Sequence, residues 1–374
     1  MNSSINFLFK QIDEELNRSN PFENINNFEN HQVDEEHLSK TIELYTKKSP
    51  IAVKSRIENE YFKFGPLEEL IDNENISEIL INGPKSIFYE ENGIIKQHQD
   101  YFFSDRTYLN FIDRFCSNNR TTLDLHRPSA KGKWRNYRFH IIAPPLCEQY
   151  HCMSLRKHQN KYIDLNYLIE TGWTTMVGYE CLKHIVDSKA NALIIGPTGT
   201  GKTTVLNSLL NLLPNNERII CIEDTNEIKL PNQVSLKLLT RENAIDQKMI
   251  SFDQSELLKE SLRLRPDRIV VGEIRGKEAK DFLLALSTGH KGALCTLHAK
   301  TAKEALWRLE ILTQMGASEW NLNTIRGIIN TGIDYIIELN EDHKRRSLKS
   351  IKKLTSNDGP SFLLEEVWPN KLSF

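Results

Sequence analysis

The stretch 196–204, GPTGTGKTT, is the feature that most constrains the fold of this chain. From Gly196 to Thr203 it fits the pattern G-x-x-x-x-G-K-[ST] at every position, with a short apolar run before it and a helical pattern after it. Glycines let backbone N–H groups turn inward around phosphate groups, and the following helix N-terminus adds a favourable field. We therefore expect a phosphate-binding loop made by Gly196, Pro197, Thr198, Gly199, Thr200, Gly201, Lys202, Thr203 and Thr204.

In a loop of this kind the lysine reaches the β- and γ-phosphates, and the hydroxyl that follows it ligates Mg²⁺. The sequence thus predicts that Lys202 holds the phosphates of ATP and that Thr203 holds Mg²⁺. The pattern specifies a ligand and leaves the task of the protein open.

Acidic residues follow two further predicted strands, at the edge where open α/β sheets bind ligands. Glu223, Asp224 and Glu227 come after the strand 218–222, and Glu273 ends the strand 268–272. Such acids orient an attacking water or hold Mg²⁺ through water, which we expect above all of Glu273 and Glu223. The alternative for residues 223–227 is a solvated acidic loop that caps a helix.

His298 ends a fourth predicted strand, 292–298. An imidazole there could sense the γ-phosphate or bind Glu273, although a histidine at a strand end is by itself more often structural.

Periodicity divides the chain of 374 residues into four parts. Residues 1–60 are polar and suit a helical, partly flexible extension. Residues 61–158 predict an α+β domain, with strands at 76–81, 85–90, 134–143 and 150–158 and a helix at 105–118. Residues 159–175 resemble a linker. In 176–374, strands alternate with helices at 176–188, 253–263 and 276–287, and helices dominate to about 330, so a mostly parallel sheet is expected.

Composition narrows the class of protein further. With a formal net charge of −2, nothing indicates a chain that works by neutralising a nucleic-acid backbone. No apolar run approaches the roughly 18–20 residues that span a bilayer, so a cytoplasmic protein is expected. The pattern around Cys147, His151 and Cys152 is a weak match to a zinc site, and a plain loop is the favoured interpretation.

Four motifs in this order resemble those of the secretion/traffic ATPase superfamily, which serves type II and type IV secretion and type IV pili. GPTGTGKTT is similar to its Walker A motif, IEDTNEIKL to its Asp box, LRLRPDRIVVGEIRG to its atypical Walker B motif, and TGHKGALCTLHA to its His box. The likeness extends over about residues 62–354 and is greatest to the CpaF-type ATPases of Tad/Flp pilus assembly.

The resemblance implies a RecA-like ATPase domain preceded by a PAS-like α+β domain and a short helical extension. It also implies a homohexameric ring in which arginines of the N-terminal domain, here Arg138 and Arg156, reach the γ-phosphate. Arg241, Arg263, Arg265 and Arg268 fall in family patterns as site or interface arginines. Because KGKWRNY (131–137) replaces the usual Asp/Gly-rich turn, Arg135 and Arg138 both stay open as the first of these arginines.

The function expected from the resemblance is a motor peripheral to the inner membrane. It would drive assembly or retraction of a pilus, or secretion, through an inner-membrane platform, without direct contact with nucleic acid. An ATP-dependent nucleic-acid translocase, a conjugation-type secretion ATPase and a non-hydrolysing nucleotide-regulated scaffold are the alternatives.

Overall fold

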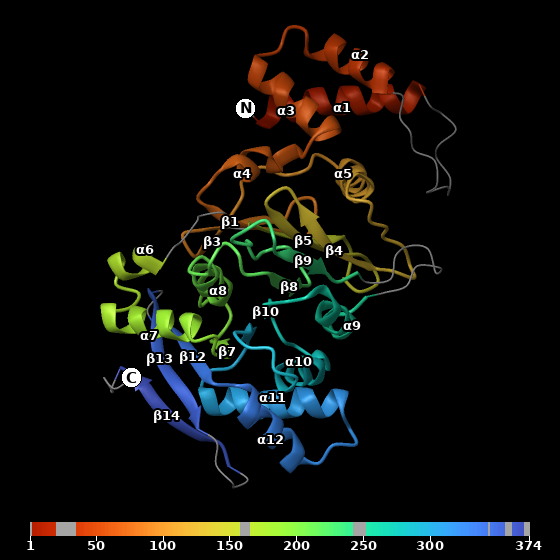
Figure 1. Ribbon diagram of the computed structural model, residues 1–374. Helices are drawn as coiled ribbons and strands as arrows, with labels where there is room; N and C mark the ends of the chain where they lie inside the picture. Colours follow the sequence, from red (N-terminus) through yellow and green to blue (C-terminus); the bar gives the residue numbers. More distant parts are fainter. Residues whose placement is uncertain are drawn as a thin grey trace. The chain divides into compact units, whose positions relative to one another are not determined.

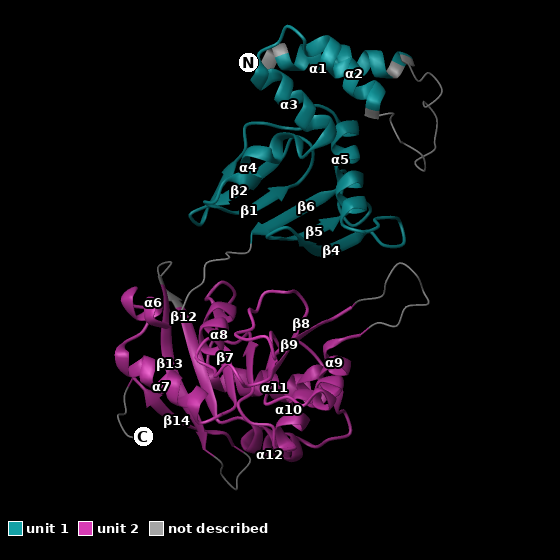
Figure 2. Cartoon of the chain, turned by 45° about the horizontal axis from the view of Figure 1, so that its top comes forward, with its two compact units in different colours: residues 1–160 teal, residues 161–374 magenta. Residues whose placement is uncertain are grey.

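The computed structural model describes residues 2–19, 35–157, 165–241, 252–342, 345–355 and 361–369 (Figure 1). The chain divides into two compact units, residues 1–160 and 161–374 (Figure 2). Among the described residues, no helix combines the length and the apolar character that crossing a membrane requires.

Unit 1 begins with three helices, α1 (Asn2–Ser19), α2 (Glu35–Thr46) and α3 (Ile51–Phe62). Their apolar faces meet in a small core of their own, in which Ile12, Ile42 and Ile57 are almost completely buried. Burial of such aliphatic side chains is the main stabilising contribution to a bundle of this size. The segment predicted as a partly flexible extension thus contains a packed helical bundle, within the ranges that the structure describes.

A six-stranded antiparallel sheet follows, in the order β3-β2-β1-β6-β5-β4. The strands are β1 (Ile76–Ile81), β2 (Ile87–Glu91), β3 (Ile94–Gln97), β4 (Ser129–Trp134), β5 (Tyr137–Ile142) and β6 (Cys152–Lys157). One face packs against α4 (Glu68–Asp72), the preceding 3₁₀ turn η1 (Gly65–Leu67) and α5 (Asp105–Asn118), with Tyr137, Phe139 and Phe111 in the core. The opposite face carries the alternate, polar side chains of β5 and β6.

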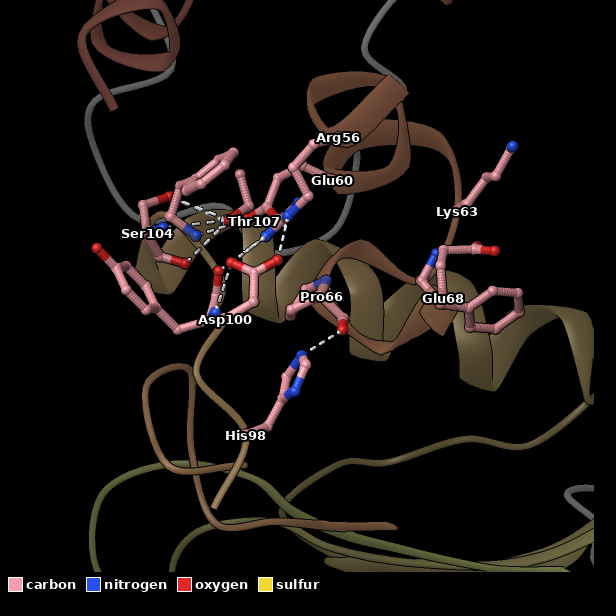
Figure 3. A network of polar contacts seen from close by, with 12 residues as sticks. Arg56, Glu60, Lys63, Pro66, Glu68, His98, Asp100, Ser104 and Thr107 are labelled. Atoms are coloured by element: carbon pink, nitrogen blue, oxygen red, sulfur yellow. Dashed lines mark hydrogen bonds and ion pairs between the residues drawn. The ribbon is translucent and has the colours of Figure 1, made fainter. Parts of the chain in front are cut away.

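A buried polar network joins the helical bundle to this module (Figure 3). Glu60, on α3, is fully buried and accepts hydrogen bonds from Arg56, from the backbone amide of Phe103 and from the hydroxyl of Thr107 at the start of α5. Arg56 also binds Asp100 and the carbonyl of Tyr101. A buried carboxylate is stable only when it is paired and hydrogen-bonded, so α3 is fixed to α5 and to the loop before it.

Unit 2 is built on an eight-stranded sheet in the order β14-β13-β12-β7-β11-β10-β8-β9. Five of its strands are β7 (Ala192–Ile195), β8 (Ile219–Glu223), β9 (Leu236–Leu239), β10 (Arg268–Val271) and β11 (Leu294–Leu297), which run parallel to their neighbours. β12 (Tyr335–Asp342) pairs parallel with β7, and β13 (Arg345–Thr355) and β14 (Leu363–Trp368) extend the sheet antiparallel.

Helices cover both faces of this sheet. α9 (Gln254–Ser261), α10 (Glu278–Ser287), α11 (Ala302–Gly316) and α12 (Leu322–Gly332) pack on one face, where Leu193 and Ile195 point. α6 (Leu165–Glu170), α7 (Met176–Asp187) and α8 (Lys202–Leu210) pack on the other, where Ala192 and Ile194 point. Strands covered on both faces read as continuous apolar runs, which is why 192–195 was recognisable.

The structure differs from the sequence-based expectations in three places. Residues 165–173 were assigned to a linker, but Leu165, Leu168 and Trp173 pack into the core of unit 2; residues 159–164 lie outside the described ranges. No strand was predicted after about residue 330, but three strands follow α12, because the β-branched residues Ile336 and Ile337 fill both faces of the sheet. β4 was not predicted, because its sequence SAKGKW, with Gly132 between Lys131 and Lys133, lacks the alternation of apolar and polar residues that indicates a strand.

Candidate nucleotide site

The phosphate-binding loop connects β7 to α8, as the sequence predicts. Gly199 and Gly201 have φ angles of 86° and 90°, a left-handed conformation that glycine adopts without steric cost. Gly201 immediately precedes α8, so the backbone N–H groups of the first turn are open toward the loop. The loop has the geometry of an anion cradle at a helix N-terminus.

Lys202 is buried and folds back over its own loop. Its ammonium donates to the carbonyl oxygens of Gly196 and Pro197, both at 2.9 Å, and lies 3.1 Å from Nδ1 of His298. Burial lowers the pKa of Lys202 to about 8, against the opposing pull of Glu273. No described carboxylate lies within ion-pair distance of this ammonium, so a bound anion would compensate a charge that the protein leaves uncompensated.

His298 follows β11 and connects Lys202 to Glu273. Because an ammonium can only donate, Nδ1 of His298 is the acceptor and Nε2 carries the proton. Nε2 lies 2.9 Å from Oε1 of Glu273, but the two atoms are not aligned for a hydrogen bond, and Oε1 stays buried without a hydrogen-bond partner. Burial and the adjacent Lys202 lower the pKa of His298, which keeps the ring neutral at pH 7.

Arg275, which the sequence reasoning missed, holds the other side of Glu273. Its guanidinium donates to Oε2 of Glu273 and lies 3.8 Å from Oδ2 of Asp224. Lys202, His298, Glu273, Arg275 and Asp224 therefore form a continuous polar chain along the carboxyl ends of β7, β11, β10 and β8. Opposite charges two residues apart in the same loop, at Glu273 and Arg275, are the sequence signal that could have indicated this ion pair.

Glu223 lies deeper than the other acids. One oxygen accepts hydrogen bonds from the backbone amides of Glu227 and Ile228, and the other is 3.3 Å from the ammonium of Lys237. Burial raises the pKa of Glu223 despite these partners. A Cβ on Gly272 would lie 3.2 Å from the Glu223 side chain, so the Gly272-Glu273 sequence leaves room for it. The acidic turn thus fixes one oxygen of Glu223, and among the described residues the other oxygen is buried without a hydrogen-bond partner.

The residues present also suit a divalent cation beside the phosphates. Thr203 is half-buried at the start of α8, and among the described residues Oε1 of Glu273 is a buried carboxylate oxygen without a hydrogen-bond partner. Oxygen donors of these two kinds are those that Mg²⁺ prefers.

Unit 1 carries Arg138 and Arg156 directly opposite each other on β5 and β6, so both side chains project from the open face of the sheet. Lys133 lies opposite Arg138 on β4, and Glu78 lies opposite Arg156 on β1. Arg135 instead occupies the β4–β5 turn with its guanidinium 4.7 Å from the centre of the Trp134 ring.

The remaining candidate arginines lie elsewhere. Arg263 and Arg265 precede β10, at the opposite edge of the sheet from the phosphate-binding loop, and Arg268 at the start of β10 is buried. Their placement does not support a part in the nucleotide site. Arg241 lies next to β9, its guanidinium 5.6 Å from the centre of the Phe252 ring.

Comparison with known proteins agrees with this arrangement. The profile of the family described as "Type II/IV secretion system protein" matches residues 60–337. A protein of Mycobacterium tuberculosis (strain H37Rv) named for conjugal transfer is 29% identical over 303 residues, covering 79% of this chain and 85% of its own. The type IV secretion system protein PtlH of Bordetella pertussis is 26% identical, covering 80% of this chain and 95% of its own.

Solved structures show the same fold. The pilus retraction motor PilT with bound ADP superposes with a TM-score of 0.55 at 21% identity, covering 78% of this chain and 82% of its own. The ATPase DotB of Legionella pneumophila superposes with a TM-score of 0.52 at 19% identity, covering 80% of this chain and 81% of its own. Since the family profile covers most of both units, the chain belongs to the type II/IV secretion system protein family and is an ATPase of that family.

Proposed function

We propose that this ATPase is a homohexameric motor that uses ATP hydrolysis to drive a pilus or secretion machine through an inner-membrane platform. The observation that carries the proposal is the polar chain from Lys202 through His298 to Glu273, next to the phosphate-binding loop. It places a phosphate-binding cation, a neutral imidazole and a carboxylate with one unpartnered oxygen at a single sheet edge. This set can bind ATP and position an attacking water.

Each residue has a definite task in this proposal. Lys202 and the amides of the loop bind the β- and γ-phosphates, and Thr203 holds Mg²⁺, with Glu273 and Glu223 acting on it through water. The cation, when bound, supplies charge neutralisation at the phosphates. Glu273 orients the water, and His298 contacts the γ-phosphate. Glu227 and Asp224 complete the acidic edge.

Arg138 and Arg156 are proposed to reach the γ-phosphate and stabilise the transition state. Their direct opposition on one sheet face supports this task, because two adjacent cations are stabilised by a polyanion. Arg135 is held against Trp134, which favours Arg138 as the first of the two arginines. We assign the protein to the CpaF-type branch of Tad/type IV-like pilus assembly, on the strength of the motif resemblance.

A conjugation-type secretion ATPase is the second candidate, and relatives named for conjugal transfer favour it. Both candidates place the protein at the cytoplasmic side of the inner membrane, bound through partners. The two candidate functions are distinguished by deleting the gene and complementing the strain with wild-type or Glu273→Gln protein. Loss of surface pili supports the first candidate, and loss of DNA transfer with intact pili supports the second. Normal pili, secretion and transfer in the deletion strain would contradict both.

Two further measurements test the hexameric state and the alternative of a nucleic-acid translocase. Mass photometry with ATP and Mg²⁺ should show a six-chain species, whereas a monomer under all conditions contradicts the ring. ATPase activity should be unchanged by added single- or double-stranded DNA; strong stimulation would favour a nucleic-acid translocase.

A further inference from the structure

Unit 2 contains a cavity at one edge of its sheet, and the phosphate-binding loop lies at the opposite edge. The cavity has a volume of about 960 Å³. Arg218 and Asp267, which line it, directly precede β8 and β10, whereas the nucleotide site lies beyond the carboxyl ends of the same strands. We call it the basic cavity, after the four cations in its lining: Lys189, Arg218, Arg263 and Arg265.

Among the described residues, the two carboxylates of the lining, Glu217 and Asp267, compensate only part of this positive charge. Glu217 pairs with Lys189 at 3.0 Å and with the buried Arg268. Burial opposes its ionisation, but the hydrogen bonds from Arg268 and Lys189 outweigh burial and lower the pKa of Glu217. One carboxylate thus serves two cations, of which Arg268 still has an Nη1 without a hydrogen-bond partner.

Asp267 is likewise engaged away from the cavity cations, because it accepts a hydrogen bond from the backbone amide of Arg218. The guanidinium of Arg218 donates to the carbonyl oxygens of Leu264 and Val234. Carbonyl oxygens satisfy its hydrogen bonds without supplying a negative charge. The guanidinium of Arg218 is therefore held in place by neutral acceptors and forms no ion pair with any described residue.

Arg265 is the most unusual residue of the lining. It is exposed, and it makes no hydrogen bond or ion pair within the part of the chain that the structure describes. Its φ of 53° lies in the left-handed region, which is costly for a side chain of this size, and Pro266 follows it. Backbone strain of this kind concentrates at functional sites. Within the described ranges, Arg263 forms one ion pair, with Glu260 on the surface, where such pairs contribute little.

We propose that the basic cavity binds a small ligand that carries two or more phosphate groups. Guanidinium groups present paired N–H donors that match phosphate oxygens, and three of the four cations are arginines. The cavity volume is within the range of about 300–1,000 Å³ that is usual for small-molecule sites. One phosphate would fill only part of this space, which favours an oligophosphate or a nucleotide. This proposal does not depend on the motor function proposed above.

The test uses the full chain with Lys202→Ala, which weakens the phosphate-binding loop. Inorganic tripolyphosphate is titrated by isothermal calorimetry, and we expect saturable binding of one ligand per chain. Adding Arg263→Glu and Arg265→Glu should weaken the affinity by at least about tenfold, because two charge-assisted contacts become repulsive. Both side chains are exposed, so the variant should fold, which its thermal unfolding curve verifies.

A matched control carries Lys303→Glu and Lys353→Glu in the same background, an equal change of charge at exposed positions outside the lining. Its affinity for tripolyphosphate should stay within about twofold. Absence of saturable binding, or equal loss in the control and in the Arg263/Arg265 variant, would overturn the proposal. A parallel titration with a non-hydrolysable GTP analogue identifies the source of the phosphates: tighter binding than tripolyphosphate indicates a nucleotide, and equal binding an inorganic polyphosphate.

Discussion

The ammonium of Lys202 lies 3.1 Å from Nδ1 of His298, so the phosphate-binding loop and the end of β11 share a direct contact. Through His298 this contact continues to Glu273, 2.9 Å away on the neighbouring strand. Arrival of a phosphate at Lys202 must therefore disturb the imidazole and, with it, the carboxylate. The predictions below follow from this chain of contacts and from the residues around it.

Lys202→Ala and Glu273→Gln should abolish turnover in different ways. Lys202→Ala removes the phosphate-binding cation, so nucleotide affinity is lost along with hydrolysis. Glu273→Gln keeps the shape and hydrogen bonds of the site but cannot activate water, so ATP still binds while kcat falls about 10²–10⁴-fold. Phosphate release and fluorescent-nucleotide binding measure the two effects, with Lys183→Ala as an exposed control. Near-normal hydrolysis in either site variant contradicts the assignment.

ATP affinity should depend on pH through Lys202. The pKa of its ammonium in the empty site is about 8, and bound phosphates raise it, so binding above pH 8 requires uptake of a proton. Affinity should be flat below pH 8 and fall by up to about tenfold per pH unit above it. Calorimetry in buffers of different ionisation enthalpy measures the proton uptake directly. Zero uptake at pH 9 would show that Lys202 is already charged in the free protein.

Arg275 is expected to act as a positioning residue for Glu273. Arg275→Ala releases the carboxylates of Glu273 and Asp224 from their shared cation, so we expect kcat to fall about tenfold or more while ATP affinity changes less. Arg275→Lys should recover part of the loss, because a cation returns without the planar fork. A separate thermal unfolding measurement excludes general destabilisation as the cause. Equal losses in the alanine and lysine variants at unchanged stability would point to direct contact of the guanidinium with ATP.

Arg138→Ala and Arg156→Ala should lower kcat by about 10³-fold with small changes in nucleotide affinity, the pattern of transition-state arginines. Arg135→Ala is the matched control from the same strand pair. Its guanidinium stacks on Trp134, so its removal should cost stability and leave kcat nearly unchanged. If Arg135→Ala loses turnover and Arg138→Ala does not, the two roles are reversed.

Glu60→Ala should destabilise unit 1 by roughly 1–3 kcal/mol, because it leaves the amide of Phe103 and the hydroxyl of Thr107 without their buried acceptor, while Arg56 keeps Asp100. Chemical unfolding of residues 1–160 within the full chain, followed by hydrogen exchange, measures the loss. Glu36→Ala, in an exposed pair with Lys40, serves as the control and should change stability by less than about 1 kcal/mol.

Local patterns predicted much of the parallel core. The apolar run 192–195 and the glycines after it specify a buried strand and an anion loop without reference to the rest of the chain. α5, predicted at 105–118, has those bounds, because Ser104 caps its first turn. The predicted strand 150–158 corresponds to β6, and its last residue lies outside the described ranges.

Other features depend on contacts between distant residues, which one sequence does not reveal. The role of Glu223 in the acidic turn requires Lys237, fourteen residues away on β9. The turn at Arg135 interrupts a stretch that the sequence predicts as one continuous strand. Arg135 has a φ of 52°, and its guanidinium lies over the Trp134 ring. The sequence around Arg268 predicts an exposed side chain. In the structure Arg268 is buried, because it donates hydrogen bonds to the carboxylate of Glu217 and to the carbonyl oxygen of Val186.

The buried carboxylate of Glu60 has a mechanical consequence. It locks α3 to α5, and α5 packs against the sheet whose open face carries Arg138 and Arg156. The bundle of α1, α2 and α3 therefore acts as a rigid arm on that sheet. A small rotation of the sheet about an axis near the two arginines becomes a larger displacement at the far end of the arm. In the motor proposed above, shortening α1 and α2 would reduce this displacement and leave the nucleotide site of unit 2 unchanged.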